Sequence, residues 1–487
     1  MKKEDPLLTF DVALPTHGSR SISRSLHAQL KAAIRSGRFA AGLRLPATRA
    51  LAQHLGISRN SVIAAYDLLT VEGHVRTRTG SGHYVCDALP QAEPRDAAAS
   101  ARHRERRLNA DYRGLAGWID MVDPPGYRFD FRLGVPEIAS LALDVWGRLS
   151  NRSMRAMARR EPGYASASGE PALRAAIAAH VAVTRAVACN ADDVIVTAGA
   201  QQAFDLLARV LVTPGRTVVA VEDPGYPPLR AAFAAAGAQI VPVPVDDDGL
   251  RVDLLPADAH VICVTPSHQF PLGSVLSALR RRQLLAVARQ RGAVIIEDDY
   301  DGEFRFDGRP LDALQTLCDD ESVLYVGTFS KSLFPGLRMG FVIAPGWARQ
   351  ALTVARQRAD WHGNLQIQNT LASFIAEGHL ARHVRRMRIV YGERRRRLIE
   401  GLHEQLGRWL APIPGSAGLH IGTRPVEAFD VARVVAESRA LGVNVDWIGR
   451  YAIGHEDANG LLFGYGAIDA AAIPKALRLL GSVFAAK

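Results

Sequence analysis

The N-terminal part of the chain has a hydrophobic pattern that predicts three short helices followed by two strands. Apolar residues at helical spacing predict helices over 21–36, 47–55 and 58–73, and extended runs follow over 74–78 and 83–87. Gly37 stops the first helix, and Ser58 is a good N-cap for the third. A short turn containing two glycines joins the extended runs. This order of elements is that of a winged helix-turn-helix.

The rest of the chain alternates continuous β-branched runs with helical segments. The apolar runs cover 193–198, 217–223, 239–245, 260–266, 293–299 and 322–328. Such runs are typical of a buried, mainly parallel sheet with helices on both faces. About the last 100 residues mix helices with short strands and predict a smaller α+β lobe. The predicted fold class is multi-domain, with an α+β winged helix-turn-helix, an α/β body and a small C-terminal α+β lobe.

Chain length supports this division, because 487 residues are too many for one hydrophobic core. A polar stretch rich in Ala, Pro and Arg separates the two patterns and is predicted to be a linker. The predicted domains are a winged helix-turn-helix domain at 1–86, a linker at 87–110, a large domain at 111–380 and a small lobe at 381–487.

Composition excludes several classes of protein. With 48% apolar and 22% charged residues, the chain is not disordered, collagenous or a coiled coil. Its four cysteines lie far apart, which disfavours a disulfide scaffold and a zinc site. No signal-like segment and no stretch of about 18 apolar residues occurs. We therefore expect a cytoplasmic protein with no membrane partner.

The positive charge is concentrated at the N-terminus. Residues 1–86 carry a net charge of +7 out of a formal +10 for the whole chain. Such asymmetry is typical of a polyanion-binding module joined to an ordinary globular body. A basic surface that only keeps the protein in solution is the alternative interpretation.

The start of the predicted second helix of the motif carries side chains suited to DNA. In a helix-turn-helix these residues reach bases or phosphates, and arginine can fork onto either. Taken singly, each arginine is more often a solvated surface charge, but together they favour DNA binding. The candidate DNA contacts are Arg44, Arg49, Ser58, Arg59, Asn60, Ser61, Gly80, Ser81 and Gly82.

The run GRFAAGLRLPATRALAQHLGISRNSVIAAYDLLTVEGHVRTRTGSGHYV resembles the N-terminal domain of the GntR family of bacterial regulators. The resemblance covers roughly residues 20–86. It implies that a dimer binds double-stranded operator DNA, with Arg49, Arg59 and the wing near the nucleic acid.

The clearest chemical signal in the body is GTFSKSLFPGLRMGF, in which Lys331 follows an apolar strand. A lysine in a partly desolvated pocket can have a lowered pKa and form a Schiff base with an aldehyde. Thr328, Ser330 and Arg338 supply donors suited to a phosphate. A surface lysine at a turn is the alternative when this motif is taken alone.

Other residues of the body favour a cofactor-binding lysine over a surface lysine. Asp298 ends a buried strand, where a carboxylate can pair with a protonated pyridine nitrogen, and Tyr300 could meet a phenolic oxygen. Ala200 and Gln201 open a helix whose backbone N–H groups invite an anion, and the ring of Tyr226 could stack on a flat cofactor. A metal site at the acidic run is disfavoured, because no histidine lies near it in sequence. Together these residues predict a pocket for pyridoxal 5'-phosphate (PLP).

The body resembles fold-type I PLP enzymes of the aspartate aminotransferase class over roughly residues 125–485, through GAQQ, DPGY, HQFPLG, EDDYDGEF and TFSKSLFPGLRMG. The whole chain resembles the MocR subfamily of the GntR regulators. The resemblance implies an internal aldimine on Lys331, with Asp298 at the pyridine nitrogen, Tyr300 at the phenolic oxygen and Tyr226 over the ring. It assigns Ala200, Gln201, Thr328, Ser330 and Arg338 to the phosphate. It also matches Tyr164 to a tyrosine that such dimers donate across their interface.

Two departures from the enzyme pattern bear on activity. Aminotransferases carry Asn-Pro-Thr-Gly beneath the cofactor, whereas this loop begins His268-Gln269-Phe270-Pro271 and lacks the asparagine. The late strand also holds no arginine to clamp a substrate carboxylate; Arg450 or Arg230 could substitute. Without a positioned carboxylate, the proximity gain falls, and we expect weak or absent transaminase activity.

We therefore predict a DNA-binding transcriptional regulator that binds PLP on Lys331 and responds to PLP or to an amino-compound effector. Its expected partners are operator DNA, a small-molecule effector and a second copy of the chain in a head-to-tail homodimer. An active PLP-dependent aminotransferase tethered to DNA is the alternative, and a dimerisation scaffold without cofactor is a third. The effector, the operator and the sign of regulation stay open at this stage.

Overall fold

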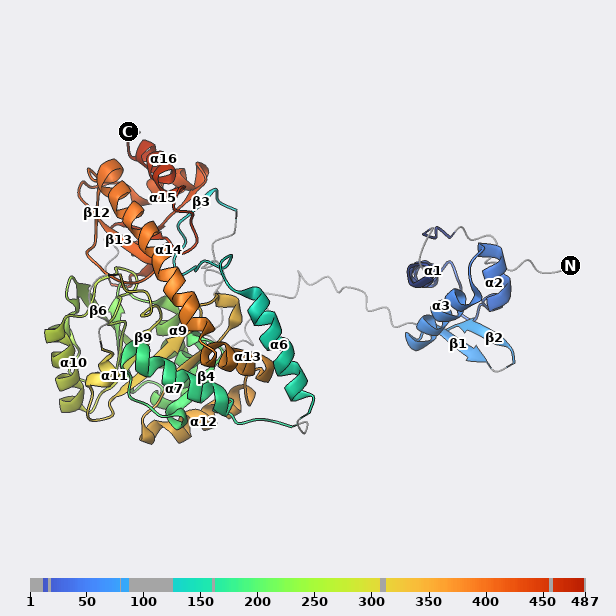
Figure 1. The fold of residues 1–487 in the computed structure, drawn as a ribbon, viewed down its shortest axis with the longest axis horizontal. Helices are drawn as coiled ribbons and strands as arrows, with labels where there is room; N and C mark the ends of the chain where they lie inside the picture. The colour runs from blue at the N-terminus through green and yellow to red at the C-terminus, as the bar shows by residue number, and fades with distance from the viewer. Residues whose placement is uncertain are drawn as a thin grey trace. The chain divides into compact units, whose positions relative to one another are not determined.

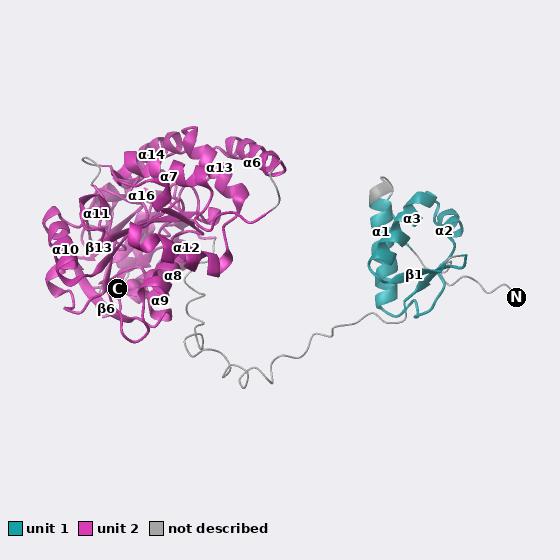
Figure 2. Ribbon diagram, turned by 90° about the horizontal axis from the view of Figure 1, so that it is seen from below, with its two compact units in different colours: residues 1–113 teal, residues 114–487 magenta. Residues whose placement is uncertain are grey.

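The computed structural model describes residues 12–15, 19–78, 80–86, 126–159, 163–306, 312–454 and 459–485. The chain forms two compact units, residues 1–113 and 114–487, which are described separately (Figure 2). The predicted linker, 87–110, lies outside the described residues. Within the described part of the chain, no helix combines the length and the apolar character needed to cross a membrane.

The first unit is a winged helix-turn-helix, as predicted (Figure 1). Its elements are α1 (Ser19–Arg35), α2 (Thr48–Leu55), α3 (Arg59–Val71), β1 (Val75–Arg78) and β2 (Gly82–Val85). The two strands pair antiparallel. Ser58 caps α3, because its side chain accepts a hydrogen bond from the backbone N–H of Ser61.

A small core holds α3 against the rest of this unit. Leu26 and Leu30 of α1 and Val62 and Leu69 of α3 are fully buried and belong to one hydrophobic cluster. Tyr66 is also fully buried, and its hydroxyl donates to the carbonyl oxygen of Pro46 at 3.1 Å. The buried face therefore fixes α3, and its opposite face is left to the solvent.

The second unit is built on an eight-stranded sheet in the order β4-β11-β10-β9-β8-β5-β6-β7. The strands are β4 (Val194–Thr197), β5 (Val218–Asp223), β6 (Gln239–Asp246), β7 (Gly249–Leu250), β8 (Val261–Val264), β9 (Val294–Asp299), β10 (Val323–Thr328) and β11 (Gly340–Ile343). The strands from β10 through β9, β8 and β5 to β6 are parallel. In contrast, β11 runs antiparallel to both β10 and β4, and β7 runs antiparallel to β6. The sheet is thus mainly parallel, as predicted.

Helices cover both faces of this sheet. The helices of the second unit that precede the C-terminal lobe are α6 (Leu143–Met157), α7 (Pro171–Arg185), α8 (Ala200–Leu211), α9 (Pro227–Ala235), α10 (Ala278–Arg291), α11 (Leu314–Leu317), α12 (Gly346–Asp360), α13 (Leu365–Ala376) and α14 (His379–Gly401). Single-turn elements are η3 (Ala191–Asp193), η4 (Val252–Leu254), η5 (Pro335–Leu337), the π-turn η6 (Leu402–Leu406) and η7 (Ile448–Tyr451).

The alternation along β5 shows how the two helical layers are divided. Val219 shares a buried cluster with Phe204 of α8 and Leu352 of α12. The next residue, Ala220, belongs to a different cluster that includes Leu284 of α10. Because successive side chains of a strand point to opposite faces, α8 and α12 cover one face and α10 covers the other.

The C-terminal lobe is a smaller α+β layer, as predicted. It contains β12 (Leu410–Pro412), β13 (His420–Pro425), α15 (Val431–Ala440), β14 (Val443–Asn444), β15 (Asp446–Trp447), β16 (Leu461–Gly464) and α16 (Ile473–Ala485). A strand from far upstream, β3 (Phe129–Asp130), pairs in parallel with β14. The segment near residue 130 therefore packs with the C-terminal lobe.

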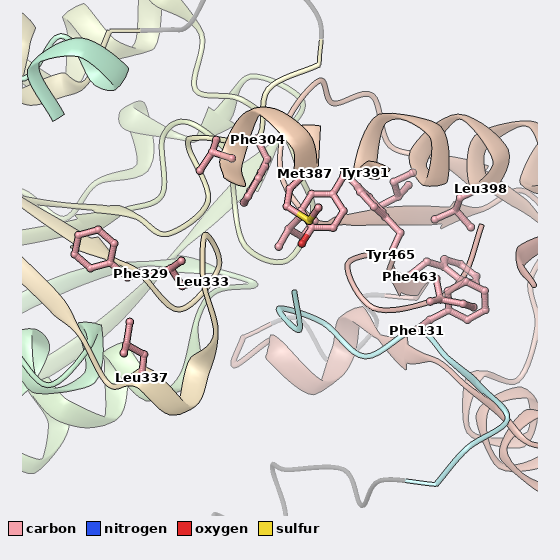
Figure 3. Close-up of a cluster of buried hydrophobic side chains, with 14 of the residues drawn as sticks. Phe131, Phe304, Phe329, Leu333, Leu337, Met387, Tyr391, Leu398, Phe463 and Tyr465 are labelled. Carbon is pink, nitrogen blue, oxygen red and sulfur yellow. The ribbon is translucent and has the colours of Figure 1, made fainter. Parts of the chain in front are cut away.

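One continuous core joins the lobe to the sheet (Figure 3). Met387, Tyr391 and Leu398 lie along α14 within this cluster. Tyr391 makes an edge-to-face contact with Phe304, at 5.0 Å between ring centroids. Phe131 makes a similar contact with Phe463 at 5.3 Å. This packing fixes the lobe beside the ends of the strands, where the candidate site lies.

Candidate functional site

A cavity of about 550 Å³ opens at the carboxyl ends of β5, β9 and β10. Its volume is in the range of small-molecule sites, and strand ends are where ligands bind in open α/β sheets. Of the ten residues predicted to bind cofactor, nine line this cavity: Ala200, Gln201, Tyr226, Asp298, Tyr300, Thr328, Ser330, Lys331 and Arg338. The tenth, Tyr164, does not line it.

Lys331 follows β10 and enters the cavity close to the backbone of Gly134. Its Nζ atom donates to the carbonyl oxygen of Gly134 at 2.8 Å. A Cβ atom at position 134 would overlap Nζ, so this approach requires glycine. Burial lowers the pKa of Lys331, and the nearby carboxylates of Asp301 and Asp298 oppose the shift. A lowered pKa increases the fraction of the neutral, nucleophilic amine.

Asp298, near the end of β9, presents a buried carboxyl with an unused oxygen. The side chain is 4% exposed, and among the described residues Oδ1 has no hydrogen-bond partner. Burial raises its pKa well above the usual range, as do the neighbouring Asp299 and Asp301. A protonated ring nitrogen placed at Oδ1 would supply both the missing donor and the missing positive charge. The residues present therefore fit the pyridine ring of PLP.

The opposite end of the cavity is suited to a phosphate. α8 begins directly after Gly199, whose φ of 81° favours glycine, and the first N–H groups of this 12-residue helix are available to an anion. Arg338 lies against this turn and donates to the carbonyl oxygen of Ala198 at 2.9 Å. The hydroxyls of Thr328 and Ser330 are 3.0 Å apart on the facing segment. A helix terminus, a guanidinium and two hydroxyls are the donors that a phosphate requires.

Two aromatic side chains complete the walls. The ring of Tyr226 packs edge-to-face on Phe270, at 5.3 Å between ring centroids. Tyr300 donates its hydroxyl to the carbonyl oxygen of His268 at 2.9 Å. Both tyrosines line the cavity together with Lys331 and Asp298.

Sequence reasoning missed one group of residues in this region. Asp301 and His420 also line the cavity, and His268 lies directly behind them. The side chains of His268 and Asp301 are 3.0 Å apart, from Nδ1 to Oδ2. No histidine is near the acidic run in sequence, but the fold brings in His268 from the loop after β8 and His420 from β13. The only sequence signal was the unusual HQFPLG loop.

The two arginines considered as carboxylate clamps are occupied elsewhere. Arg450 pairs with Asp446 at 3.2 Å, and Arg230 donates to the carbonyl oxygen of Tyr451 at 3.0 Å. Neither lines the cavity. Tyr164 is 78% exposed and stacks on Trp361, with their ring centroids 4.5 Å apart.

In the first unit, the candidate DNA residues divide into exposed and structural ones. Arg44, Arg49, Arg59, Asn60 and Gly80 are exposed. Arg59 donates to the hydroxyl of Thr48 at 3.4 Å, which links the starts of α3 and α2.

The other candidates have contacts within the motif. Ser61 is 5% exposed, and its hydroxyl lies 2.9 Å from that of the capping Ser58. Ser81 binds the hydroxyl of Tyr84 at 2.6 Å, and Gly82 lies against the guanidinium of Arg44. These contacts shape the cap of α3 and the wing.

The comparisons with known proteins match both units. The family described as "Bacterial regulatory proteins, gntR family" matches residues 22–85. The family "Aminotransferase class I and II" matches residues 131–435. Among solved structures, an archaeal alanine:glyoxylate aminotransferase has a TM-score of 0.69 and 26% identity, covering 74% of this chain and 92% of its own.

Two relatives are similar along almost their entire lengths. The probable rhizopine catabolism regulatory protein MocR of Rhizobium meliloti is 36% identical, over 99% of this chain and 96% of its own. The pyridoxine biosynthesis transcriptional regulator PdxR of Corynebacterium glutamicum is 34% identical, over 95% of this chain and 96% of its own. The chain thus belongs to the MocR subfamily of the GntR transcriptional regulators, with a fold-type I aminotransferase-like domain.

Proposed function

We propose that this regulator holds PLP covalently on Lys331 and changes its binding to operator DNA in response to PLP or to an amino compound. The observation that carries the proposal is the pairing, in one cavity, of a desolvated lysine with a buried carboxyl that has an unused oxygen. When bound, PLP supplies an aldehyde that reacts with amines. The Nζ amine of Lys331 would form a C=N bond to it with loss of one water.

Other side chains would hold the rest of the cofactor. Asp298 would accept a hydrogen bond from the ring nitrogen, and Tyr300 and Tyr226 would contact the ring. Ala200, Gln201, Thr328, Ser330 and Arg338 would surround the phosphate, since they line the same cavity. The names of the relatives differ in their chemistry, as one refers to pyridoxine biosynthesis and another to rhizopine catabolism. The effector is therefore PLP or an amine that displaces Lys331 from it.

The charged groups in the cavity support a regulatory role rather than catalytic transamination. Among the described residues that line it, Arg338 is the sole arginine, and it lies at the phosphate end. Arg230 and Arg450, the other candidates, are engaged with Tyr451 and Asp446. A substrate carboxylate would then lack a bidentate clamp, so that its Cα–H bond would be poorly aligned for proton transfer.

The proposal includes a homodimer that works in the cytoplasm. Tyr164 and Trp361 form an exposed aromatic pair on the second unit, which supports a contact with a second copy. A dimer would present two DNA-binding units to the two half-sites of an operator. The proposed divisions are a DNA-binding domain at 1–86, a linker at 87–110 and an aminotransferase-like body from 111 onward, with its small lobe at 381–487.

Titration of labelled operator DNA, selected from a random pool, tests the function. We expect the apparent Kd of the full-length protein to change when PLP, or PLP with an amine from a small panel, is added. The Lys331→Ala variant should still bind DNA but lose this response. Unchanged DNA affinity under every ligand, or net transamination of an amino acid with a keto acid at enzymatic rates, would contradict the proposal.

A further inference from the structure

At the cavity wall, three polar groups from two segments meet: Tyr300 and Asp301 line the cavity, and His268 lies behind them. His268 comes from the loop after β8, and Tyr300 and Asp301 follow β9. His268 is 2% exposed and Asp301 is 1% exposed. The Nδ1 atom of His268 is 3.0 Å from Oδ2 of Asp301 and 3.0 Å from the hydroxyl oxygen of Tyr300. A buried group of this kind is costly unless each member is satisfied.

The chemistry of the three groups assigns their hydrogen bonds. The carboxylate of Asp301 accepts, so Nδ1 of His268 carries the proton. The Tyr300 oxygen, at the same distance from Nδ1, can accept from the same N–H. The Tyr300 hydroxyl is then free to donate, and it donates to the carbonyl oxygen of His268 at 2.9 Å. His268 therefore holds the oxygen of Tyr300, and the tyrosine proton can turn toward a ligand.

The imidazole is held in place by packing as well. A Cβ atom at Gly418 would overlap the His268 ring, so the ring lies directly on this backbone. The ring of His420 lies on another side, at 4.5 Å between centroids, and its Nε2 donates to the carbonyl oxygen of Pro271 at 3.0 Å. Burial lowers the pKa of His420 well below its usual range, so this neighbour is neutral. The orientation of His268 is thus fixed before any ligand binds.

We propose that His268 is a positioning residue for Tyr300, with Asp301 fixing its tautomer, in a loop that lacks the asparagine of the aminotransferases. This inference rests on the proposed PLP site. His268 does not line the cavity and acts only through Tyr300.

This arrangement would set the pKa of the nitrogen in the C=N linkage between Lys331 and PLP. A Tyr300 hydroxyl that donates to the phenolic oxygen of PLP stabilises negative charge there, which favours loss of the proton from the linkage nitrogen. If Tyr300 loses its hydrogen bond with His268 and no longer donates to PLP, the linkage nitrogen holds its proton more strongly. The visible absorption band should then titrate at higher pH. Among the described residues, the titratable and charged groups that face this region are Tyr226, Asp298, Tyr300, Asp301, Lys331, Arg338, His420 and Tyr451 in the cavity, Arg395 behind His268, and Glu222 and Asp299, whose charges act on Tyr300.

The test is a pH titration of the visible band of the PLP-loaded full chain and its variants. His268→Leu removes the Nδ1–H donor to Tyr300. We expect the midpoint of the pH titration to rise by about 0.5 to 1 pH unit, as for the loss of one buried hydrogen bond. His268→Asn keeps an N–H near the position of Nδ1 and should leave the midpoint within about 0.3 unit of wild type. His268→Gln moves the donor one bond further out and should behave like the leucine variant, which provides a second test if the leucine variant does not fold.

A double-mutant cycle separates positioning from a direct charge effect. Tyr300→Phe should raise the midpoint, and adding His268→Leu should produce no further rise, because His268 acts through the Tyr300 oxygen. Additive shifts, or an unshifted midpoint in both His268→Leu and His268→Gln, would overturn the inference. If the wild-type protein forms no visible band with PLP, the proposed function itself fails, and that result is distinct from an unshifted titration.

Discussion

Burial acts on two opposite charges in the cavity and favours the neutral form of both. It lowers the pKa of the Lys331 amine and raises the pKa of the Asp298 carboxyl. Neither group has a full partner of opposite charge: Nζ of Lys331 donates to the backbone of Gly134, and Oδ1 of Asp298 has no partner among the described residues. A ligand with an aldehyde at one end and a basic ring nitrogen at the other would satisfy both.

Replacement of Asp298 tests this complementarity. Asp298→Asn cannot offer a negative charge to a protonated ring nitrogen, and we expect the affinity for PLP to fall by about 10- to 100-fold. Equilibrium dialysis with PLP measures the change directly. The exposed carboxylate of Asp205, which pairs with Arg209 on α8, gives a matched control, since Asp205→Asn should leave the affinity unchanged. Equal affinities in all three proteins would exclude a role of Asp298 at the ring nitrogen.

The sequence was informative for residues that act within one local motif. Lys331 and Arg338 stand on one short segment after β10, and Asp298 ends a recognisable strand, so their positions follow from strand patterns. His268, Asp301 and His420 were not predicted as a group, because their contact depends on three loops and strands that are distant in sequence. Packing between the sheet and the C-terminal lobe creates this group, and the HQFPLG loop alone does not predict which residues meet.

At the scale of elements, most strands were predictable, including four-residue strands such as β1, β2, β4 and β8, but β11 was not. The run that became β9 is buried over five of its six residues and begins with three β-branched residues, which made the strand clear. In contrast, β11 has four residues and directly follows a segment with the turn-forming Gly336. Its antiparallel pairing with β10 and β4 was therefore not expected, although the mainly parallel sheet was.

The start of α3 combines two kinds of residue that a mutation can separate. Arg59 is exposed, whereas Ser61 is buried and bonded to the capping Ser58. We expect Arg59→Gln to weaken binding to a long random-sequence duplex and to reduce the slope of log K against log salt by about 1. Ser61→Ala should leave this slope unchanged and destabilise the first unit by about 1 kcal/mol. If Ser61→Ala reduced the salt slope and Arg59→Gln only destabilised the first unit, the roles assigned to these two residues would be wrong.

The first half of α14 contains a buried histidine that should make the second unit sensitive to acid. Burial lowers the pKa of His383 to about 4, and Arg386 adds to the shift. Because the folded state binds the proton less well than the unfolded state, stability is full above pH 6.5 and falls as the pH drops toward about 4.

Removal of the titrating group should reduce this loss. We expect the free energy of unfolding of His383→Met to decrease less between pH 7.5 and pH 5 than that of wild type, by about 1 to 2 kcal/mol. Urea unfolding followed by tryptophan fluorescence is suitable, because all six tryptophans lie at or after residue 118. An identical pH dependence in the two proteins would contradict the assignment.

At the scale of the whole molecule, charge and chemistry are separated along the chain. Residues 1–86 carry +7 of the formal +10, and the cavity lies entirely within the second unit. Ligand binding at Lys331 must therefore change contacts that differ between two arrangements of the regulator if it is to alter DNA binding. This division was predictable from the sequence, because composition and hydrophobic period both change near residue 90.

The most direct test of the account is chemical trapping of PLP on the full-length protein. The protein would be incubated with PLP, reduced with borohydride and mapped by peptide mass spectrometry, with Lys331→Ala treated in parallel. The account predicts a visible absorption band that reduction removes, a stable pyridoxyl group on Lys331, and neither signal in the variant. A protein that forms no band and is not labelled at Lys331, or a variant that is labelled to the same extent elsewhere in the cavity, would contradict it.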